Sequence, residues 1–578
     1  MMASTKSSPP SDTAVAAEVI ASVDTCRALR KRVKEHQRVK AEDPFPAVMN
    51  SLPPREKCDR LVESYLRTFE LMYRVVHIPS FRKQYTEYWE RPQAASAGFR
   101  IKILLILALG CSVEREEEVF MSVCPYVSQW VFAAQWWLTG PAERSTAGQE
   151  GLQVHCLLIL ARQAHSIGNS GSNWTLSGSL LHFACMQGLH RDPKHFPELS
   201  FVDAETRRRL WATVLELLLQ TSIDAYMSPM FCLDDFDTEP PSNLNDAEFD
   251  QHTSVPPPPR PEAEFTQTSI QVLLHQSIRC RLDTMKFLNK SRGTEQCYDT
   301  ALRLGTELQS FSQKSEVLFH SRAGQKNNIF HKKLTDMILH RAILLLHRPF
   351  VLRGAGDPRF HFSRKVGLES AMVLLSHLGD LDASSGTVDE FARLTMMSTG
   401  TFKGAISLDA ITTVCLEVLS QLYEEGGKTG PEHASRSVVV DMARASRALM
   451  VQTLEHVQKQ LERLVARGDP SLKRYVFLNT TLAQIRALGT GNPPEATARE
   501  ALKDSLQACR NMLEQYIHTA QLPEYSPLTS GLFDVENNQV LSNDELFNSL
   551  IGDPAFNLEF DPSRLLSMWD DQNIHVSL

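Results

Sequence analysis

The chain has 578 residues, of which 42% are hydrophobic and 22% charged, an ordinary globular composition that excludes a chain disordered throughout. The net charge of -8 comes from residues 531–578, where nine acidic residues accompany one arginine, and 59 basic residues balance 59 acidic ones over residues 1–530. A chain of this length is expected to form more than one packed unit.

Residues 1–54 form the first predicted segment, a disordered and basic arm. Its first 14 residues are rich in serine, proline and threonine, which is typical of disorder. The basic stretch at residues 27–40 has three interpretations: the solvated face of a helix, a nuclear import signal, or a segment that contacts nucleic-acid phosphates. The candidate residues for import or phosphate contact are Arg27, Arg30, Lys31, Arg32, Lys34, Arg38 and Lys40.

From Cys58 onward the chain has the pattern of a helical protein. Apolar residues between Leu61 and Met72 recur at spacings of three and four, which predicts a helix with one face toward a core. Pro79 is expected to stop this run, and Ser80 to cap the helix that follows. Further helices are predicted near residues 99–112, 117–137, 149–166, 174–188, 203–227, 264–290, 295–320, 328–348, 363–380, 404–424, 431–467, 471–488 and 495–519.

The fold class that follows is all-α. The proline-rich and acid-rich stretch at residues 234–261 is predicted to be a surface loop, and no segment of useful length alternates as a strand would. We therefore expect a multi-helix regulatory domain over residues 55–525, between the N-terminal arm and an acidic tail at residues 526–578.

The predicted helix at residues 203–227 is expected to be central. Asp203 is a plausible N-cap, and apolar residues cover nearly the whole circumference beyond it, as in a buried helix. Glu216 and Asp224 lie inside this apolar stretch, and a buried carboxylate without a partner costs several kcal/mol. We expect partners from other helices, with Arg191 and Arg348 as candidates, so that Arg191, Glu216, Asp224 and Arg348 are predicted to be buried structural polar residues.

Membrane and structural zinc sites are not expected. The longest strongly apolar run, Ile103–Leu109, has seven residues, whereas a helix that spans a bilayer needs about 20. The eleven cysteines include no CxxC pair, and the two closest, Cys111 and Cys124, are 13 positions apart. The cysteines are therefore predicted to be reduced and mostly buried thiols.

Enzyme motifs are also missing from the sequence. It contains no phosphate-binding loop, dinucleotide fingerprint, nucleophile elbow or zinc-protease motif, so we predict no catalytic residue, metal ligand or cofactor. Residues 168–172 only imitate an elbow, because Ser172 stands where a glycine is needed. His182, His190 and His195 are spaced by eight and five residues, which does not place all three on one helical face, and we interpret them as structural.

Six motifs in register resemble the middle homology region of fungal-specific transcription factors. The resemblance covers about residues 55–520, and the motif-rich part is 55–350. It implies an all-α regulatory domain in a nuclear transcription regulator, commonly a dimer, without catalytic residues. The motifs are Leu66-Arg-Thr-Phe69, His77-Ile-Pro-Ser-Phe81, Gly188-Leu-His-Arg-Asp-Pro193 followed by His195-Phe-Pro197, Arg207-Arg-Arg-Leu-Trp211, Asp234-Asp-Phe-Asp-Thr-Glu-Pro-Pro241 and Leu344-Leu-Leu-His-Arg-Pro-Phe350.

One departure from this family concerns DNA binding. Members normally carry an N-terminal cluster of six cysteines that binds two zinc ions and places a helix in the major groove. Cys26 is the only cysteine before Cys58 here, so we expect the zinc cluster to be lacking. DNA binding is thus implied by the family only, and DNA contact is expected to be indirect or weak.

Residues 526–578 have the composition of an activation domain. Acidic residues alternate with bulky apolar ones, and carboxylate repulsion keeps such apolar groups available to a coactivator groove. The alternative is a C-terminal segment that folds back onto the body. The candidate activation residues are Leu546, Phe547, Leu550, Phe556, Phe560 and Trp569.

Three functional hypotheses follow. The first is a nuclear transcription regulator of fungal type that recruits coactivators through its tail and forms homodimers, or heterodimers with related zinc-cluster regulators. The second is a partner without a cluster that heterodimerises with a complete zinc-cluster transcription factor and restrains it. The third is a helical enzyme or small-molecule receptor whose pocket is invisible in the sequence. The first is our prediction, which makes the chain a regulator rather than an enzyme.

Overall fold

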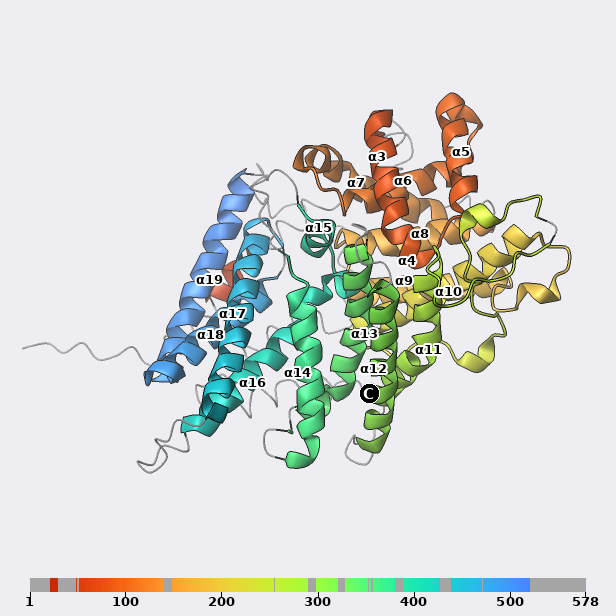
Figure 1. Cartoon of the computed structure of the whole chain (residues 1–578). Helices are drawn as coiled ribbons and strands as arrows, with labels where there is room; N and C mark the ends of the chain where they lie inside the picture. Colours follow the sequence, from red (N-terminus) through yellow and green to blue (C-terminus); the bar gives the residue numbers. More distant parts are fainter. Residues whose placement is uncertain are drawn as a thin grey trace, which may run out of the picture. The chain divides into compact units, whose positions relative to one another are not determined.

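The computed structural model consists of helices joined by turns and short 3-10 segments, which confirms the all-α prediction (Figure 1). It describes residues 21–26, 28–29, 48, 51–139, 148–253, 255–289, 298–320, 328–351, 353–354, 357–379, 388–426, 438–469 and 471–519. Two compact units divide the chain: a larger unit of residues 39–410, and a smaller unit of residues 1–38 and 411–578. The helical body predicted over residues 55–525 is thus divided near residue 410.

The described residues of the larger unit form thirteen labelled helices. Helices α3, α4 and α5 come first, α10 lies near the middle of the sequence, and α15 comes last. Their bounds are α3 Arg55–Arg67, α4 Phe69–Tyr73, α5 Ile78–Glu90, α6 Ala97–Cys111, α7 Glu117–Thr139, α8 Gln149–Ala164, α9 Ser170–Met186, α10 Phe201–Ala225, α11 Ser269–Leu288, α12 Tyr298–His320, α13 Asn328–Val351, α14 His361–Ser376 and α15 Glu390–Met397.

Helix α6 shows how this unit closes its core. Thirteen of its 15 residues are buried, because its sequence is apolar on all sides, and it packs against α3, α7 and α8 (Figure 1). At Gly110 the backbone of α6 comes so close to α3 that an added Cβ would lie 2.1 Å from the Leu61 carbonyl oxygen. The contact between α3 and α6 therefore depends on a glycine at this position.

Two predicted helix starts are wrong. Pro79 does not end a helix but lies in the first turn of α5, where its missing N–H costs nothing, and His77 rather than Ser80 is the N-cap. Helix α10 begins two residues before its predicted cap, because the Ser200 hydroxyl accepts a hydrogen bond from the backbone N–H of Asp203 at 3.2 Å. Helix α15 was not predicted at all.

The smaller unit is a set of long helices. Helices α17 (Val438–Ala466), α18 (Leu472–Thr490) and α19 (Pro494–Thr519) pack against one another (Figure 1). Helix α16 (Leu408–Gly426) begins just before this unit, and the Arg447 guanidinium of α17 pairs with Glu425 of α16 at 2.9 Å.

One described segment, Gly400–Glu425, is long and apolar enough to cross a membrane, by length and composition alone. Its most apolar 18-residue window is 61% buried inside the protein. Such burial is typical of a core helix, since the apolar side chains of a spanning helix would face lipid.

Candidate functional site: buried ion pairs around helix α10

Helix α10 carries a continuous buried segment through the larger unit. Every residue from Arg209 to Ile223 is buried, and α10 packs against α8, α9 and α11. The helix ends at Tyr226, whose backbone adopts the left-handed conformation with a φ of 55°. Because the polar residues of α10 lie away from solvent, each needs a partner inside the protein.

The first group of buried charges meets at Asp246, in the loop before α11. Nη1 of Arg209 lies 2.7 Å from Oδ1 of Asp246, and Nε of Arg209 lies 3.3 Å from Oε1 of Glu205. Arg74, which follows α4 in the left-handed conformation, pairs with the same Asp246 carboxylate. All four side chains are at most 3% exposed, so two guanidinium groups share one carboxylate in the core.

The pKa values of this group follow from burial and from these partners. Burial opposes the ionisation of Asp246, but the charges of Arg74 and Arg209 and the N–H of Ile78 outweigh it and lower the pKa of Asp246 to about 2. For Glu70, burial is stronger than the nearby Arg74 charge and raises the pKa to about 7. At neutral pH, Asp246 is therefore ionised and Glu70 is partly protonated.

The second group lies in the middle of α10. Arg281 of α11 binds Glu216 with two hydrogen bonds, from Nη1 to Oε1 at 2.8 Å and from Nη2 to Oε2 at 2.6 Å. Gln220 donates to the same carboxylate at 2.7 Å and accepts a hydrogen bond from the Tyr73 hydroxyl at 3.1 Å. The Glu216 carboxylate thus joins α10 to α11, and Gln220 extends the connection to α4.

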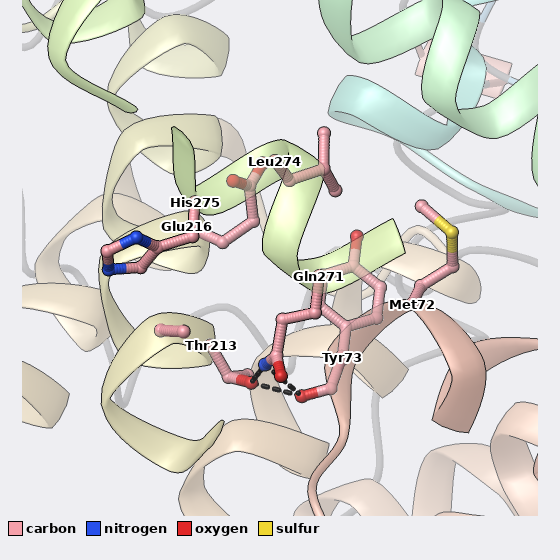
Figure 2. A pocket seen from close by; sticks show the side chains of 8 residues that line it. Met72, Tyr73, Thr213, Glu216, Gln271, Leu274 and His275 are labelled. Carbon is pink, nitrogen blue, oxygen red and sulfur yellow. Dashed lines mark hydrogen bonds between the residues drawn. The ribbon is translucent and has the colours of Figure 1, made fainter. Parts of the chain in front are cut away.

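Figure 2 shows the side chains between these three helices. The Gln271 amide of α11 donates to the Thr213 hydroxyl at 3.0 Å and to the backbone carbonyl of Tyr73 at 3.3 Å, and Thr213 donates to that same carbonyl. His275 lies near Glu216, and burial lowers the pKa of its imidazole to about 4. The space between these side chains is too small for a water molecule, so the arrangement fixes helices and offers no ligand chamber.

The third group lies at the C-terminal end of α10. Asp224 pairs with Arg341 of α13, and it also accepts hydrogen bonds from the Thr401 N–H and hydroxyl at 3.1 Å and from Gln163 of α8 at 3.3 Å. Gly400 has a φ of 61°, and an added Cβ there would lie 2.1 Å from the Asp224 carboxylate. A glycine is therefore required for the backbone to reach Asp224.

Both carboxylates that the sequence placed in the core have arginine partners on other helices, but these are not the arginines that we named. Arg191 corrects our prediction most clearly: its side chain is 54% exposed, and it lies 3.5 Å from Asp237. The reason is its place in the turn after α9, outside the packed helices.

Arg348 is not the partner of Glu216 or Asp224 either. It pairs with Asp409 at 3.3 Å and is 18% exposed. Asp409 also accepts a hydrogen bond from the Tyr226 hydroxyl at 2.9 Å. Arg348 is therefore connected to Tyr226, at the C-terminal end of α10, through the Asp409 carboxylate.

A fourth group surrounds Asp192, which was not singled out from the sequence although it lies within a motif. Its side chain is fully buried and accepts hydrogen bonds from Arg208 at 3.0 and 2.8 Å and from the backbone N–H groups of Lys194 and Glu239 at 2.9 Å. Burial opposes the ionisation of Asp192, but these donors outweigh it and lower its pKa to about 2.

Asp192 brings together three segments that are distant in sequence. Around it, Thr238 donates to the Leu189 carbonyl at 2.6 Å, and the Trp211 and Phe236 rings meet edge to face at 5.3 Å. The sequence showed these motifs as separate segments, and the structure shows that they contact one another. The three segments are Gly188–Pro193, Arg207–Trp211 and Asp234–Pro241.

The low pKa of Asp192 predicts acid sensitivity. A carboxyl group with a pKa near 3.8 when unfolded and about 2 when folded stabilises the fold above pH 4, and this contribution is lost as the pH falls from about 4 to 2. We expect Asp192→Asn to lower the free energy of unfolding at neutral pH and to reduce its fall between pH 4 and 2. Denaturant titrations followed by circular dichroism measure both effects.

Asp299→Asn is the matched control, because this residue of α12 is exposed, so water can solvate its carboxylate. It should leave the pH profile of the free energy of unfolding unchanged. Equal pH profiles for Asp192→Asn and the parent chain would contradict the role of Asp192.

Two groups of predicted residues lie outside the described residues. The first is the candidate import or phosphate-contacting arm: Arg27, Arg30, Lys31, Arg32, Lys34, Arg38 and Lys40. The second is the candidate activation tail: Leu546, Phe547, Leu550, Phe556, Phe560 and Trp569.

The chemistry available to this network is structural. Within the described ranges, no three His, Cys, Asp or Glu side chains are grouped so that they could hold a metal ion. The carboxylates around α10 are held by arginines, which fixes them in place. An open cleft of about 390 Å³ lies elsewhere in the larger unit, between residues 51–57 and helix α7.

The part of the chain that contains helix α10 also matches a known protein family. Residues 62–332 match the family model described as "Fungal specific transcription factor domain". The chain is 42% identical to Transcription factor opdR of Penicillium oxalicum over 89% of the chain, and 31% identical to Transcription factor lepE of Aspergillus flavus over 94%. It is also 26% identical to the Aspyridones cluster regulator apdR of Emericella nidulans over 87% of the chain.

These relatives are longer proteins. The chain spans 66% of the length of opdR, 66% of lepE and 64% of apdR. No solved structure matches the chain.

Proposed function

The chain belongs to the fungal transcription factors that share the fungal-specific transcription factor domain, and on this premise we propose that it is a nuclear regulator of transcription that performs no catalysis. The larger unit is its regulatory body, and residues 526–578 recruit coactivators. The basic arm directs the chain to the nucleus. Association with a second copy or with a related zinc-cluster regulator brings this body to DNA.

One observation carries the proposal: residues of the family motifs bind one another through a buried ion pair. Arg208 of one motif and Asp192 of another bind each other directly, and the third motif donates a backbone N–H to Asp192. Arg–carboxylate pairs of this kind hold helices in a fixed arrangement and leave no reactive group free. A rigid helical body suits a protein that acts through binding.

A reporter assay of the acidic tail tests whether the chain activates transcription. Fused to an unrelated DNA-binding module in a reporter strain, residues 526–578 should raise reporter transcription, because acidic side chains keep the apolar groups accessible to coactivators. Alanine at all six candidate residues should reduce transcription to the level of the module alone. These residues are Leu546, Phe547, Leu550, Phe556, Phe560 and Trp569.

The matched control for the tail replaces six polar residues of the same segment with alanine and should keep its activity. Loss of activity in both variants, or no activity of the parent segment, would contradict activation by the apolar groups. The control residues are Ser542, Asn543, Asn548, Ser549, Asn557 and Ser563.

Variants of the basic arm test whether it directs the chain to the nucleus. Replacing its seven basic residues with glutamine in a full-length fluorescent fusion should abolish nuclear accumulation, since import receptors recognise clustered positive charge. Exchanging only its four arginines for lysine keeps the charge and should keep accumulation. A glutamine variant that accumulates like the parent would show that the arm is not the import signal. The seven residues are Arg27, Arg30, Lys31, Arg32, Lys34, Arg38 and Lys40.

A further inference from the structure

The open cleft of the larger unit lies between the segment that leads into helix α3 and one face of helix α7. Its volume of about 390 Å³ is within the range of small-molecule sites in proteins. One wall consists of residues 51–54 and of Lys57 in the first turn of α3. The other wall consists of Ser122, Tyr126 and Gln129, which share one face of α7 because they are spaced by four and three residues.

Two hydrogen bonds join these walls. The Trp130 indole of α7 donates to the Ser51 hydroxyl at 2.8 Å, and the Lys57 ammonium donates to the Ser122 hydroxyl at 2.9 Å. Trp130 is fully buried, and its ring stacks on the ring of Tyr126 with 6.4 Å between the ring centres. The cleft is thus already formed without a ligand, which lowers the entropic cost of binding one.

The charge of the cleft is positive. Among the described residues that line it, Lys57 alone is charged, and residues 119–139 of α7 include no charged side chain. The partly buried Lys57 ammonium uses one of its three N–H donors on Ser122, and no described carboxylate lies within ion-pair distance of it. A partly desolvated cation without a counter-charge favours an anionic ligand.

The rest of the lining suits an apolar ligand body. Leu52, Pro53 and Pro54 present aliphatic surface, and Tyr126 is 41% exposed although it carries a large ring. The exposed amide of Gln129 is the remaining polar side chain on the α7 wall besides Ser122. Apolar surface with a few polar groups that fix orientation is the usual composition of a small-molecule site.

We propose that this cleft binds a small organic anion, a carboxylate with a flat apolar body. The free N–H donors of Lys57 bind the carboxylate, and the Tyr126 ring and residues 52–54 enclose the apolar body. A bound ligand connects the start of α3 to α7. The site goes beyond the proposed role in transcription and does not depend on it.

Calorimetric titration of the full chain with cinnamate, a flat carboxylate, and with its neutral amide cinnamamide tests the proposal. Cinnamate should bind at one site, and cinnamamide about tenfold more weakly, because the amide cannot pair with the ammonium charge. Lys57→Met should weaken the binding of cinnamate about tenfold and leave that of cinnamamide unchanged. Lys57→Arg keeps the charge and should keep most of the affinity. Lys57→Gln replaces Lys57→Met if that variant fails to fold.

Lys83→Met is the matched control, because Lys83 is an exposed lysine of α5 outside the cleft, and cinnamate should bind this variant as it binds the parent. Tyr126→Ala should weaken cinnamate and cinnamamide alike, by about fivefold, since it removes apolar surface that both ligands contact. A parent chain that shows no saturable binding of cinnamate would overturn the proposal. So would equal affinities of Lys57→Met and Lys83→Met for cinnamate.

Discussion

Gly110→Ala is expected to destabilise the larger unit by about 3 kcal/mol, because the new methyl group overlaps backbone that cannot move without separating two helices. The added Cβ would lie 2.1 Å from the carbonyl oxygen of Leu61 and 3.0 Å from its Cα. Alanine normally favours a helix over glycine, so the sign of this effect tests the contact and not the helix propensity. The free energy of unfolding from urea titrations measures it.

Gly98→Ala, on the same helix, is the control. The three atoms nearest to an added Cβ at Gly98 all belong to the Glu150 side chain, which is 36% exposed, and none is backbone. We expect this variant to stay within about 1 kcal/mol of the parent, since the gain in helix propensity offsets the movement of Glu150. Similar losses for the two alanine variants would mean that the close approach of α3 and α6 does not decide the stability of this region.

Arg281→Met is expected to cost about 3–5 kcal/mol, because it leaves the Glu216 carboxylate buried without a counter-charge. The arginine side chain is fully buried and the glutamate side chain is 6% exposed, so water cannot replace the lost partner. Methionine preserves most of the apolar volume, and the loss therefore reports the charge and its hydrogen bonds. Thermal and urea unfolding of the full chain measure the effect.

Two further variants make this test specific. The double variant Arg281→Met with Glu216→Met removes both charges and should recover most of the lost stability, since an apolar pair of similar size is tolerated where an unpaired charge is not. Arg191→Met removes an exposed arginine and should change the free energy of unfolding by less than about 1 kcal/mol. A double variant no more stable than Arg281→Met would contradict the role of the ion pair.

Much of the fold could be predicted because the long helices repeat their apolar pattern many times. Helix α6 was predicted at residues 99–112 and lies at Ala97–Cys111, and α12 was predicted at residues 295–320 and lies at Tyr298–His320. Helix α15 has only eight residues, too few for a periodic signal to stand out. Its Glu390 forms ion pairs with Arg67 and Arg115, contacts that no local pattern reveals.

The buried network could be predicted only in part, for a related reason. An acidic residue inside an apolar helix reveals by itself that it needs a partner, as Glu216 did. The identity of that partner depends on which helices pack together, and Arg281 lies 65 positions away on a helix with many equivalent polar residues. Asp192 gave no such signal, because it lies in a turn where a carboxylate is ordinarily solvated.

The pairing of Arg74 with Asp246 has a consequence for synthesis of the chain on the ribosome. The two residues are 172 positions apart, and at about 5–20 residues per second the polypeptide grows for roughly 10–35 s after Arg74 before Asp246 is made. Until Asp246 is made, Arg74 and Arg209 lack the carboxylate that they share and have only Glu70 and Glu205 as partners, so this buried group cannot form. Nascent chains must therefore wait, exposed to chaperones and proteases, and truncated products that end before Asp246 should be cleared rather than accumulate.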